Sequence, residues 1–138
     1  MRSILILFVA VGVLNAKFIR DDNKEVVLDT QTNLIWQDNE TISKNWSDAI
    51  SYCEDLNLGG YDDWHLPNFN ELYYLANRDK YNLAINSGFK NISTSFYWTS
   101  TTSANNSSNA WVVGFGYGDG YGSNRDDSYL VRCVRAGE

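Results

Sequence analysis

The sequence predicts one α+β domain with two helices and an antiparallel sheet, and three observations support this prediction. The chain has 138 residues, which is enough for one domain and too few for two. Apolar and polar residues alternate near both ends of the chain, as in strands, whereas helical spacing is confined to the middle. Strands, then helices, then strands in separate runs favour an α+β arrangement over a repeated βαβ sheet.

Residues 1–16, MRSILILFVAVGVLNA, have the layout of a secretory signal peptide. Arg2 precedes an apolar run over residues 4–14, and small or polar residues follow up to Ala16. The alternative is a membrane anchor, but the run is shorter than the roughly 20 residues that a spanning helix needs. We therefore expect cleavage near Ala16 and a mature domain over residues 17–138, secreted or periplasmic and without a membrane span.

Two stretches of strand open the mature chain. Residues 17–29 alternate around a polar centre at residues 21–24 and predict a β-hairpin. Residues 33–38 predict another short strand, with Leu34 and Trp36 on one face.

An amphipathic helix is predicted next. Asn45 is a favourable N-cap, and Gly59 with Gly60 would end the helix. The three- and four-residue spacing of apolar side chains gives one stripe, which consists of Trp46, Ala49, Ile50, Cys53 and Leu56.

A second helix is predicted after Asn68, which has Glu71 three residues later, as in a capping box. Leu72, Leu75 and Ala76 give this helix a buried face. Residues 78–95 are mixed in character and allow no clear assignment.

The last third of the chain predicts strands again, at residues 95–101, 110–118 and 128–136. The segments between them, 102–109 and 118–127, are rich in Gly, Ser, Asn and Asp and predict loops. Trp98 and Trp111 lie inside apolar strand patterns, so we expect them in the core rather than on a binding surface.

The formal net charge of -6 limits the possible partners. An acidic protein repels polyanions at short range, so nucleic acid and anionic membrane surfaces are poor partners. An exported protein folds under oxidising conditions, where two cysteines most simply form one disulfide, here Cys53–Cys133. A redox or catalytic pair would need close spacing or a nearby basic partner, and the sequence offers neither.

The stretch GGYDDWHLPNFNEL, residues 59–72, looks reactive because it contains Asp62, Asp63, the single His65 and Glu71. A zinc site usually needs three or four protein ligands, and this stretch could supply two at most from adjacent extended positions. For acid–base catalysis, the sequence places no nucleophile beside the histidine. We therefore expect neither a metal nor a cofactor here.

The favoured interpretation of this stretch is a structural corner. Pro67 restricts the residues before it to extended backbone, so Trp64 and Leu66 point inward. The two aspartates can then accept main-chain N–H groups in the turn. The structural residues of the corner are Asp63, Trp64, His65, Leu66, Pro67 and Glu71.

A Gly-rich segment at residues 114–128 is the best candidate for ligand binding. Its glycines allow close approach of a ligand, and tyrosine rings offer flat faces for sugars. The candidate contact residues are Tyr117, Asp119, Tyr121, Asn124 and Arg125. The alternatives are a solvated hairpin loop without a partner and a calcium site, although the spacing of the acidic residues does not match an EF-hand.

Several motifs occur in the order and spacing of one bacterial family: VVLDTQTNLIWQDN, WSDAISYCEDLNLGGYDDWHLPNFNEL, FYWTST, AWVVGFGYG and VRCVR. The chain resembles the C-terminal domain of the bacterial collagen-like adhesin, the Lcl C-terminal domain family, over essentially the whole mature region. That resemblance implies export, a C-type-lectin-like fold akin to the formylglycine-generating enzymes, and binding of glycans, sulfated ones in the adhesin itself, rather than catalysis. The chain departs from the family motif at His65, where arginine is usual.

These features predict an exported binding module that recognises a cell-surface glycan or protein and is not an enzyme. The alternatives are a structural or assembly component of a cell-envelope complex, and a degenerate enzyme. Enzymes of the formylglycine-generating type use a close pair of active-site cysteines, whereas Cys53 and Cys133 are expected to be joined. The acidic charge favours a neutral or basic partner over a polyanionic one.

Overall fold

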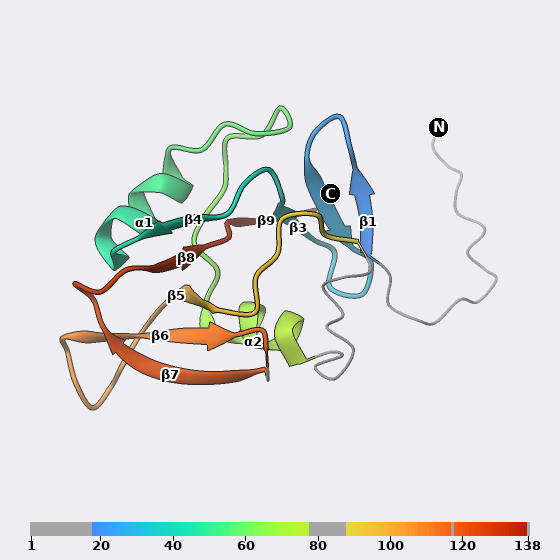
Figure 1. The fold of residues 1–138 in the computed structure, drawn as a ribbon. Helices are drawn as coiled ribbons and strands as arrows, with labels where there is room; N and C mark the ends of the chain where they lie inside the picture. Colours follow the sequence, from blue (N-terminus) through green and yellow to red (C-terminus); the bar gives the residue numbers. More distant parts are fainter. Residues whose placement is uncertain (1–17, 78–87, 117, 138) are drawn as a thin grey trace.

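The computed structural model describes residues 18–77, 88–116 and 118–137 (Figure 1). The predicted signal peptide lies outside these residues. The elements in chain order are β1 (Phe18–Asp21), β2 (Val26–Asp29), β3 (Leu34–Gln37), β4 (Ile42–Lys44), α1 (Trp46–Glu54), α2 (Phe69–Asn77), β5 (Phe96–Thr102), β6 (Asn109–Gly114), β7 (Asp119–Asn124), β8 (Tyr129–Val131) and β9 (Val134–Ala136). None of the helices in the described ranges has the length and apolar character needed to cross a membrane.

The strands form two sheets, one of four strands in the order β1-β2-β3-β9 and one of five in the order β4-β8-β5-β6-β7. All neighbouring pairs are antiparallel except β5 and β8, which run parallel. The β1–β2 hairpin lies at one end of the molecule, and β6 and β7 lie at the other (Figure 1). The prediction of an α+β domain is therefore confirmed, whereas the C-type-lectin-like assignment stays a prediction.

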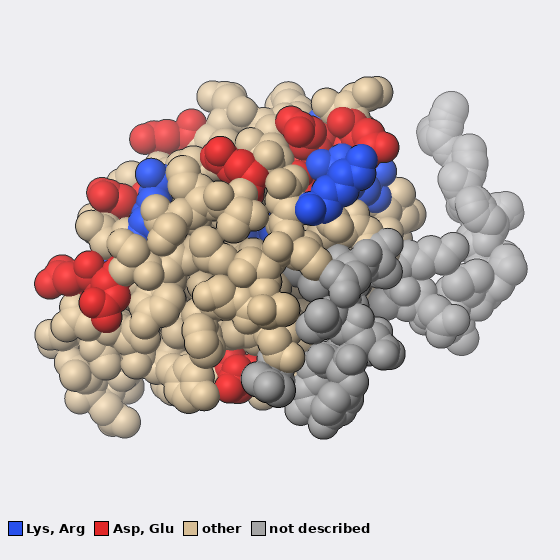
Figure 2. All heavy atoms as spheres, in the orientation of Figure 1, with Lys and Arg blue, Asp and Glu red and all other residues tan. Residues whose placement is uncertain are grey.

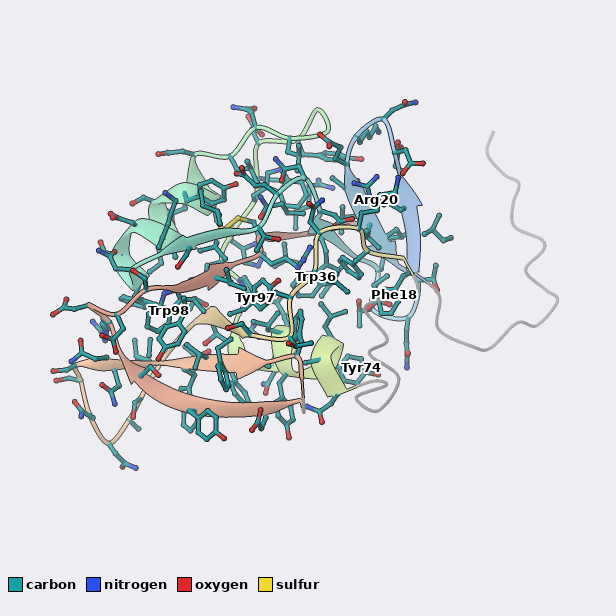
Figure 3. The ribbon with its side chains drawn as sticks, viewed as in Figure 1. Phe18, Arg20, Trp36, Tyr74, Tyr97 and Trp98 are labelled. Carbon is teal, nitrogen blue, oxygen red and sulfur yellow. A yellow bond between two sulfur atoms is a disulfide. The ribbon has the colours of Figure 1, made fainter. Side chains whose placement is uncertain are left out.

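The sheets carry a hydrophobic core on each face. Neighbouring residues of one strand contribute to opposite cores, as Ile35 and Trp36 do in β3. Helix α1 covers one core and α2 covers the other, on opposite sides of the sheets (Figure 1). Trp36, Tyr97 and Trp98 lie in the interior between the helices (Figure 3). The predicted core position of Trp98 is thus confirmed, and Trp111 is half-buried.

Helix α1 begins as predicted but ends earlier. The side chain of Asn45 accepts a hydrogen bond from the main-chain N–H of Asp48 at 2.9 Å, which confirms the N-cap. The helix ends at Glu54, before the predicted stop at Gly59 and Gly60. Both glycines have positive φ, of 66° and 85°, because they form the tight turn after the helix rather than its C-cap.

Helix α2 confirms the second predicted helix. Asn68 Oδ1 accepts from the N–H of Glu71, and Glu71 Oε1 accepts from the N–H of Asn68, both at 2.8 Å. This reciprocal pair is a capping box, and it satisfies two main-chain donors that the helix leaves open. Leu72 and Leu75 are buried, as the spacing predicts.

Two predictions about the last third are wrong. The segment at residues 118–127 is not a loop, because most of it forms β7, which pairs along its whole length with β6. The segment at residues 128–136 is not one strand, because the chain leaves the larger sheet after Val131 and joins the smaller one at Val134. The break lies at Arg132 and Cys133, which are both buried and have partners outside the strand ladder. β4 was also not predicted, since its three residues are too few to show a pattern.

Candidate functional site

Residues 132–135, Arg-Cys-Val-Arg, connect three distant parts of the chain. Cys133 forms the predicted disulfide with Cys53 of α1, with an S–S distance of 2.06 Å and a separation of 80 positions in the sequence. The sequence predicts Cys133 within a strand, but the structure places it between β8 and β9. The bond ties the first helix to the crossover between the two sheets.

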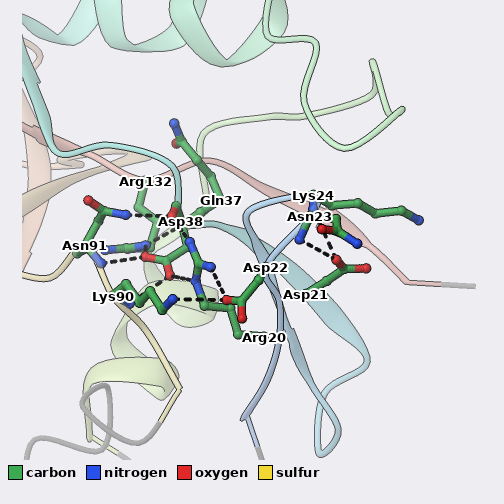
Figure 4. Close-up of polar contacts among 10 residues, drawn as sticks. All are labelled: Arg20, Asp21, Asp22, Asn23, Lys24, Gln37, Asp38, Lys90, Asn91 and Arg132. Carbon is green, nitrogen blue, oxygen red and sulfur yellow. Dashed lines mark hydrogen bonds and ion pairs between the residues drawn. The ribbon is translucent and has the colours of Figure 1, made fainter.

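Arg132 binds the end of β3, the residue after it and Asn91 (Figure 4). Its guanidinium donates to the carbonyls of Gln37 and Asn91 and lies 3.4 Å from Asp38 Oδ1. Arg132 is 2 % exposed, so this charge is held almost without solvent. A buried guanidinium needs such partners to offset its lost hydration.

Asp38 is the centre of this cluster, and its side chain has no exposed surface. One carboxylate oxygen accepts from Arg20 Nε at 2.6 Å and from the N–H of Lys90 at 2.8 Å. The other accepts from the N–H of Asn91 at 2.9 Å. Both oxygens are therefore used to hold β1, the end of β3 and residues 90–91 together, which is a structural role.

Arg135 holds the DDWHLP corner from the other side. Its guanidinium donates to both carboxylate oxygens of Asp63, at 2.5 and 3.1 Å, and lies 3.8 Å from the centre of the Tyr61 ring. The bond from Arg135 holds the pKa of Asp63 below its usual range. The sequence analysis assigned main-chain N–H groups as partners of Asp63, but the structure shows that its main partner is a side chain.

The remaining corner residues also have structural contacts. His65 exchanges two main-chain hydrogen bonds of 2.9 Å with Val134 of β9, and Trp64 and Leu66 are buried on either side of it. The carbonyl of Pro67 accepts from the N–H of Ser100 at 2.8 Å. These contacts support the interpretation of the stretch as a structural corner.

The side chain of His65 is half-exposed, and its Nε2 lies 3.5 Å from Glu71 Oε1. The hydrogen bond to Glu71 raises the pKa of His65 above its usual value. Burial raises the pKa of Glu71. The contacts with His65 and with the N–H of Asn68 lower it by more in total, so the net shift of this pKa is downward. Within the described ranges, no three His, Cys, Asp or Glu side chains gather as a metal ion would require.

The predicted binding residues do not form one cluster. Asp119, Tyr121 and Asn124 all lie on β7, Arg125 follows directly, and Tyr117 lies outside the described residues. Asp119 and Tyr121 are neighbours on one face of the strand. Asn124 and Arg125 lie at its other end.

Tyr121 is the most exposed aromatic side chain among the described residues, at 52 %. Its ring packs edge-to-face on Phe96, with centroids 5.4 Å apart. Its hydroxyl donates to Asp119 Oδ2 at 2.9 Å, and this bond raises the pKa of Tyr121. The ring is thus oriented by contacts on two sides while one side stays open to solvent.

Asn124 and Arg125 are engaged in contacts within the chain. The guanidinium of Arg125 lies 4.3 Å from the ring centre of Trp46, at the start of α1. The side-chain oxygen of Asn124 accepts from the N–H of Asp126 at 2.8 Å. Both residues therefore help to shape the turn after β7, and Tyr121 is the stronger candidate for contact with a ligand.

A second group of aromatic residues, which the sequence analysis did not identify, lies on the opposite face of β6 and β7. Phe69 of α2 stacks on Tyr73, with centroids 5.0 Å apart, and meets Trp111 of β6 edge-to-face at 5.4 Å. Tyr73 and Tyr74 are exposed by 39 % and 45 %. The signal was present in the sequence, since two adjacent tyrosines cannot both lie on the buried side of a helix.

A pocket of about 480 Å³ lies between β3 and α2. Its walls include Trp36, Asn70 and Glu71 together with Tyr73 and Tyr74. Gln31 Nε2 donates to the Tyr74 hydroxyl at 2.9 Å, which joins the β2–β3 turn to the helix. This pocket is a second place where a small ring could bind.

Charge is unevenly distributed over the visible face (Figure 2). Lys and Arg side chains gather with acidic ones at the end that carries the β1–β2 hairpin, where Asp22 contacts both Arg20 and Lys90. The surface over β6 and β7 is mostly uncharged, and Asp119 is the one charged residue within these two strands.

Comparison with known proteins adds one finding. A protein-family model described as the Lcl C-terminal domain matches residues 25–135. The matched range contains both cysteines, the DDWHLP corner, both arginines of residues 132–135 and β7. No curated protein sequence matches the chain.

Proposed function

The chain belongs to the Lcl C-terminal domain family, and from this premise we propose that it is an exported binding module for a glycan or protein at the cell surface. The family is associated with an adhesin, which supports recognition as the activity. The disulfide between Cys53 and Cys133 is compatible with a secreted or periplasmic location, where such bonds persist.

The observation that carries this proposal is the geometry of Tyr121. Its ring is 52 % exposed, yet Phe96 and Asp119 hold it in one orientation. A ring that is already ordered loses little conformational entropy when it contacts a ligand. Tyrosine also presents a flat apolar face to a sugar ring and a hydroxyl at its edge.

The charge of the surface suggests the class of ligand. The net charge of -6, and the acidic Asp119 as the one charged residue of β6 and β7, favour a neutral or basic partner over a sulfated one. We propose a non-enzymatic role, because both cysteines are joined and the single histidine is paired with Glu71.

A glycan array with neutral, amino and sulfated sugars, run alongside a pull-down from envelope extract, tests the proposal. The purified protein is compared with Tyr121→Ala and with Tyr74→Ala, which removes an exposed tyrosine from α2 instead. We expect Tyr121→Ala to lose binding to neutral or amino sugars or to a basic protein, and Tyr74→Ala to keep it.

The opposite pattern would contradict the proposed surface. Loss of binding in Tyr74→Ala alone would move the site to the pocket between β3 and α2. Binding to sulfated sugars alone would contradict the proposed ligand class, and no binding in either assay would contradict the function.

A role as a structural or assembly component of an envelope complex is the second candidate. β7 favours it, because among the described strands it is the outermost one of the larger sheet, and such edges can pair with another chain. A stable complex that co-purifies and persists in Tyr121→Ala would support this role over recognition of a soluble ligand.

A further inference from the structure

β7 is the longest exposed sheet edge among the described residues. The outermost strands are β1 and β9 in one sheet and β4 and β7 in the other. β4 and β9 have three residues each, and Val134 of β9 is covered by its bridge to His65. β1 has four residues and carries two charges, whereas β7 has six residues and one charge, Asp119, at its first position. Natural proteins usually protect edges with charge, short length or a cover, and within the described ranges β7 has only the charge of Asp119.

The main chain of β7 points alternately toward β6 and away from the sheet. The N–H of Arg125 donates to the carbonyl of Ser108 at 3.0 Å, in register with the ladder between the two strands. Hydrogen-bonded pairs recur at every second residue in antiparallel strands, so the main-chain N–H and C=O of Tyr121 point toward β6. Gly120 and Gly122 then direct their main-chain groups outward, and Figure 1 shows no described element beyond this edge.

The fold requires glycine at only one of the two glycine positions of β7. A Cβ on Gly120 would lie 2.7 Å from the Phe69 ring, so the close approach of α2 requires glycine there. A Cβ on Gly122 would have Asn109 as its nearest neighbour at 3.7 Å, and Gly122 does not have positive φ. Glycine weakens a strand interior, and one without an internal reason often marks a place where another backbone approaches.

We propose that two copies of this chain associate through the outer edges of β7, antiparallel about a two-fold axis at Gly122. In this register Gly122 pairs with its own counterpart, and Gly120 pairs with Asn124 of the second copy. The main-chain groups of Gly120 and Gly122 and the N–H of Asn124 face outward, so the ladder can form without rearranging the hydrogen bonds to β6. The carbonyl of Asn124 also accepts from the N–H of Asp127 at 3.0 Å within the turn. Two five-stranded sheets then become one continuous sheet.

Charge favours a second copy as the occupant of this edge. The same register places Asp119 opposite Arg125 of the other chain, and it does so twice because of the two-fold symmetry. The guanidinium of Arg125 also lies on the ring of Trp46 of its own chain, at 4.3 Å, so this pairing adds a charge contact to a side chain that is already positioned. Tyr121 lies opposite Ser123, and no like charges face each other within the paired strands. Opposite charges at both ends favour this antiparallel register over its neighbours.

This inference goes beyond the proposed function, since dimerisation needs no ligand. It also has a consequence for binding, because the two copies of Tyr121 would lie close together on one face of the joined sheet. Each chain would then contribute an exposed ring to a shared surface. Two linked contacts strengthen binding to a repetitive ligand without any new type of interaction.

Analytical ultracentrifugation of the purified protein tests the proposal, with Gly122→Pro and Gly122→Ala as a matched pair. Proline removes the outward N–H and blocks the new ladder, but it leaves the bonds to β6 intact. Alanine keeps that N–H and fits the space available. A single strand pair is a small interface, so we expect a dimer with Kd on the order of 10–100 μM.

The wild type and Gly122→Ala are expected to shift from monomer to dimer over this range, and Gly122→Pro to stay monomeric. Urea unfolding of each variant checks that the fold is kept. A wild type that stays monomeric at millimolar concentration would overturn the proposal, and so would a folded Gly122→Pro variant that still dimerises.

A second variant tests the register and does not depend on proline. Asp119→Lys places a positive charge opposite Arg125 of the second copy, so we expect at least a tenfold weaker dimer at low salt, with the loss reduced at high salt. An unchanged dimer in Asp119→Lys would contradict the two-fold register at Gly122.

Discussion

Arg132 and Arg135 lie three positions apart in the chain and reach different carboxylates. Arg132 contacts Asp38, and Arg135 donates hydrogen bonds to Asp63 of the corner. Both arginines are almost fully buried. Their charges are stable inside the domain because each has an acidic partner, and removal of that partner would leave an uncompensated buried charge.

Asp38→Ala is expected to destabilise the domain by about 3–5 kcal/mol, because it leaves Arg20 and Arg132 without their shared carboxylate. Urea denaturation measures the change. Asp22→Ala is the control, since Asp22 also contacts Arg20 but is exposed, and we expect little change from it. Equal effects of the two substitutions would contradict the central role of Asp38.

The pair formed by His65 and Glu71 predicts a weak dependence of stability on pH. The pKa of His65 is raised above 6.5 in the folded state, so the pair adds stability below about pH 6.5. This contribution is lost as the pH rises through the raised pKa. Because the histidine is half-exposed, we expect a loss of less than about 1 kcal/mol between pH 6 and pH 8.

His65→Arg introduces the arginine that the resemblance leads us to expect at this position, and arginine keeps its positive charge over this range. We expect the free energy of unfolding of this variant to vary less between pH 6 and pH 8 than that of the wild type. Urea denaturation at both pH values provides the comparison, and an NMR titration of the imidazole checks the raised pKa. An identical pH dependence in both proteins would show that the pair contributes nothing.

Local patterns in the sequence predict elements where nearby residues determine the structure. The capping residues Asn45 and Asn68 mark the starts of both helices correctly, because a cap depends on residues within one turn. The break between β8 and β9 could not be predicted, because the partners of Arg132 and Cys133 lie far away in the sequence. β7 was missed for a related reason, since its glycines favour a loop and only its pairing with β6 makes it a strand.

The candidate site shows the same limit. The composition of residues 114–128 predicts Tyr121 as a contact residue, and Tyr121 lies exposed on β7. The sequence does not predict that Arg125 packs on Trp46. Tyr73 and Tyr74 of α2 were not predicted as contact residues, because the helical spacing was used only to identify the buried side of this helix. Sequence patterns thus indicate which residues are suitable for contact, whereas exposure depends on tertiary packing.

Edge strand β7 allows a direct comparison of its two glycines. Gly120→Ala brings a methyl group to 2.7 Å from the ring of Phe69, so we expect a loss of about 1–3 kcal/mol from overpacking. Gly122→Ala meets nothing closer than 3.7 Å and is expected to be neutral or slightly stabilising. Urea denaturation at low protein concentration measures both, and a greater loss in Gly122→Ala would contradict this assignment.

The whole molecule depends on residues 132–135 to join its parts. This segment contacts α1 through the disulfide, the end of β3 through Arg132 and the corner through Arg135. The two sheets also share two cores, so movement at one end is resisted at the other. A frame joined in this way would hold the proposed contact surface on β7 in a fixed shape.

Removal of the disulfide tests this joining at the scale of the whole domain. The bond closes a loop of 80 residues, for which chain entropy predicts a contribution of about 4–5 kcal/mol. The Cys53→Ala/Cys133→Ala double variant should therefore unfold at a much lower urea concentration than the wild type. A change below about 1 kcal/mol would show that the cores alone hold the domain together.

Binding affinity for the strongest array ligand, compared between two single variants, tests the central claim most directly. Tyr121→Ala alters the proposed contact surface, and His65→Ala alters the reactive-looking corner. An aromatic contact of this kind contributes about 2 kcal/mol, so we predict that Tyr121→Ala weakens binding at least tenfold and that His65→Ala leaves it unchanged. Loss of binding in His65→Ala with full binding in Tyr121→Ala would contradict the account and place the function in the corner.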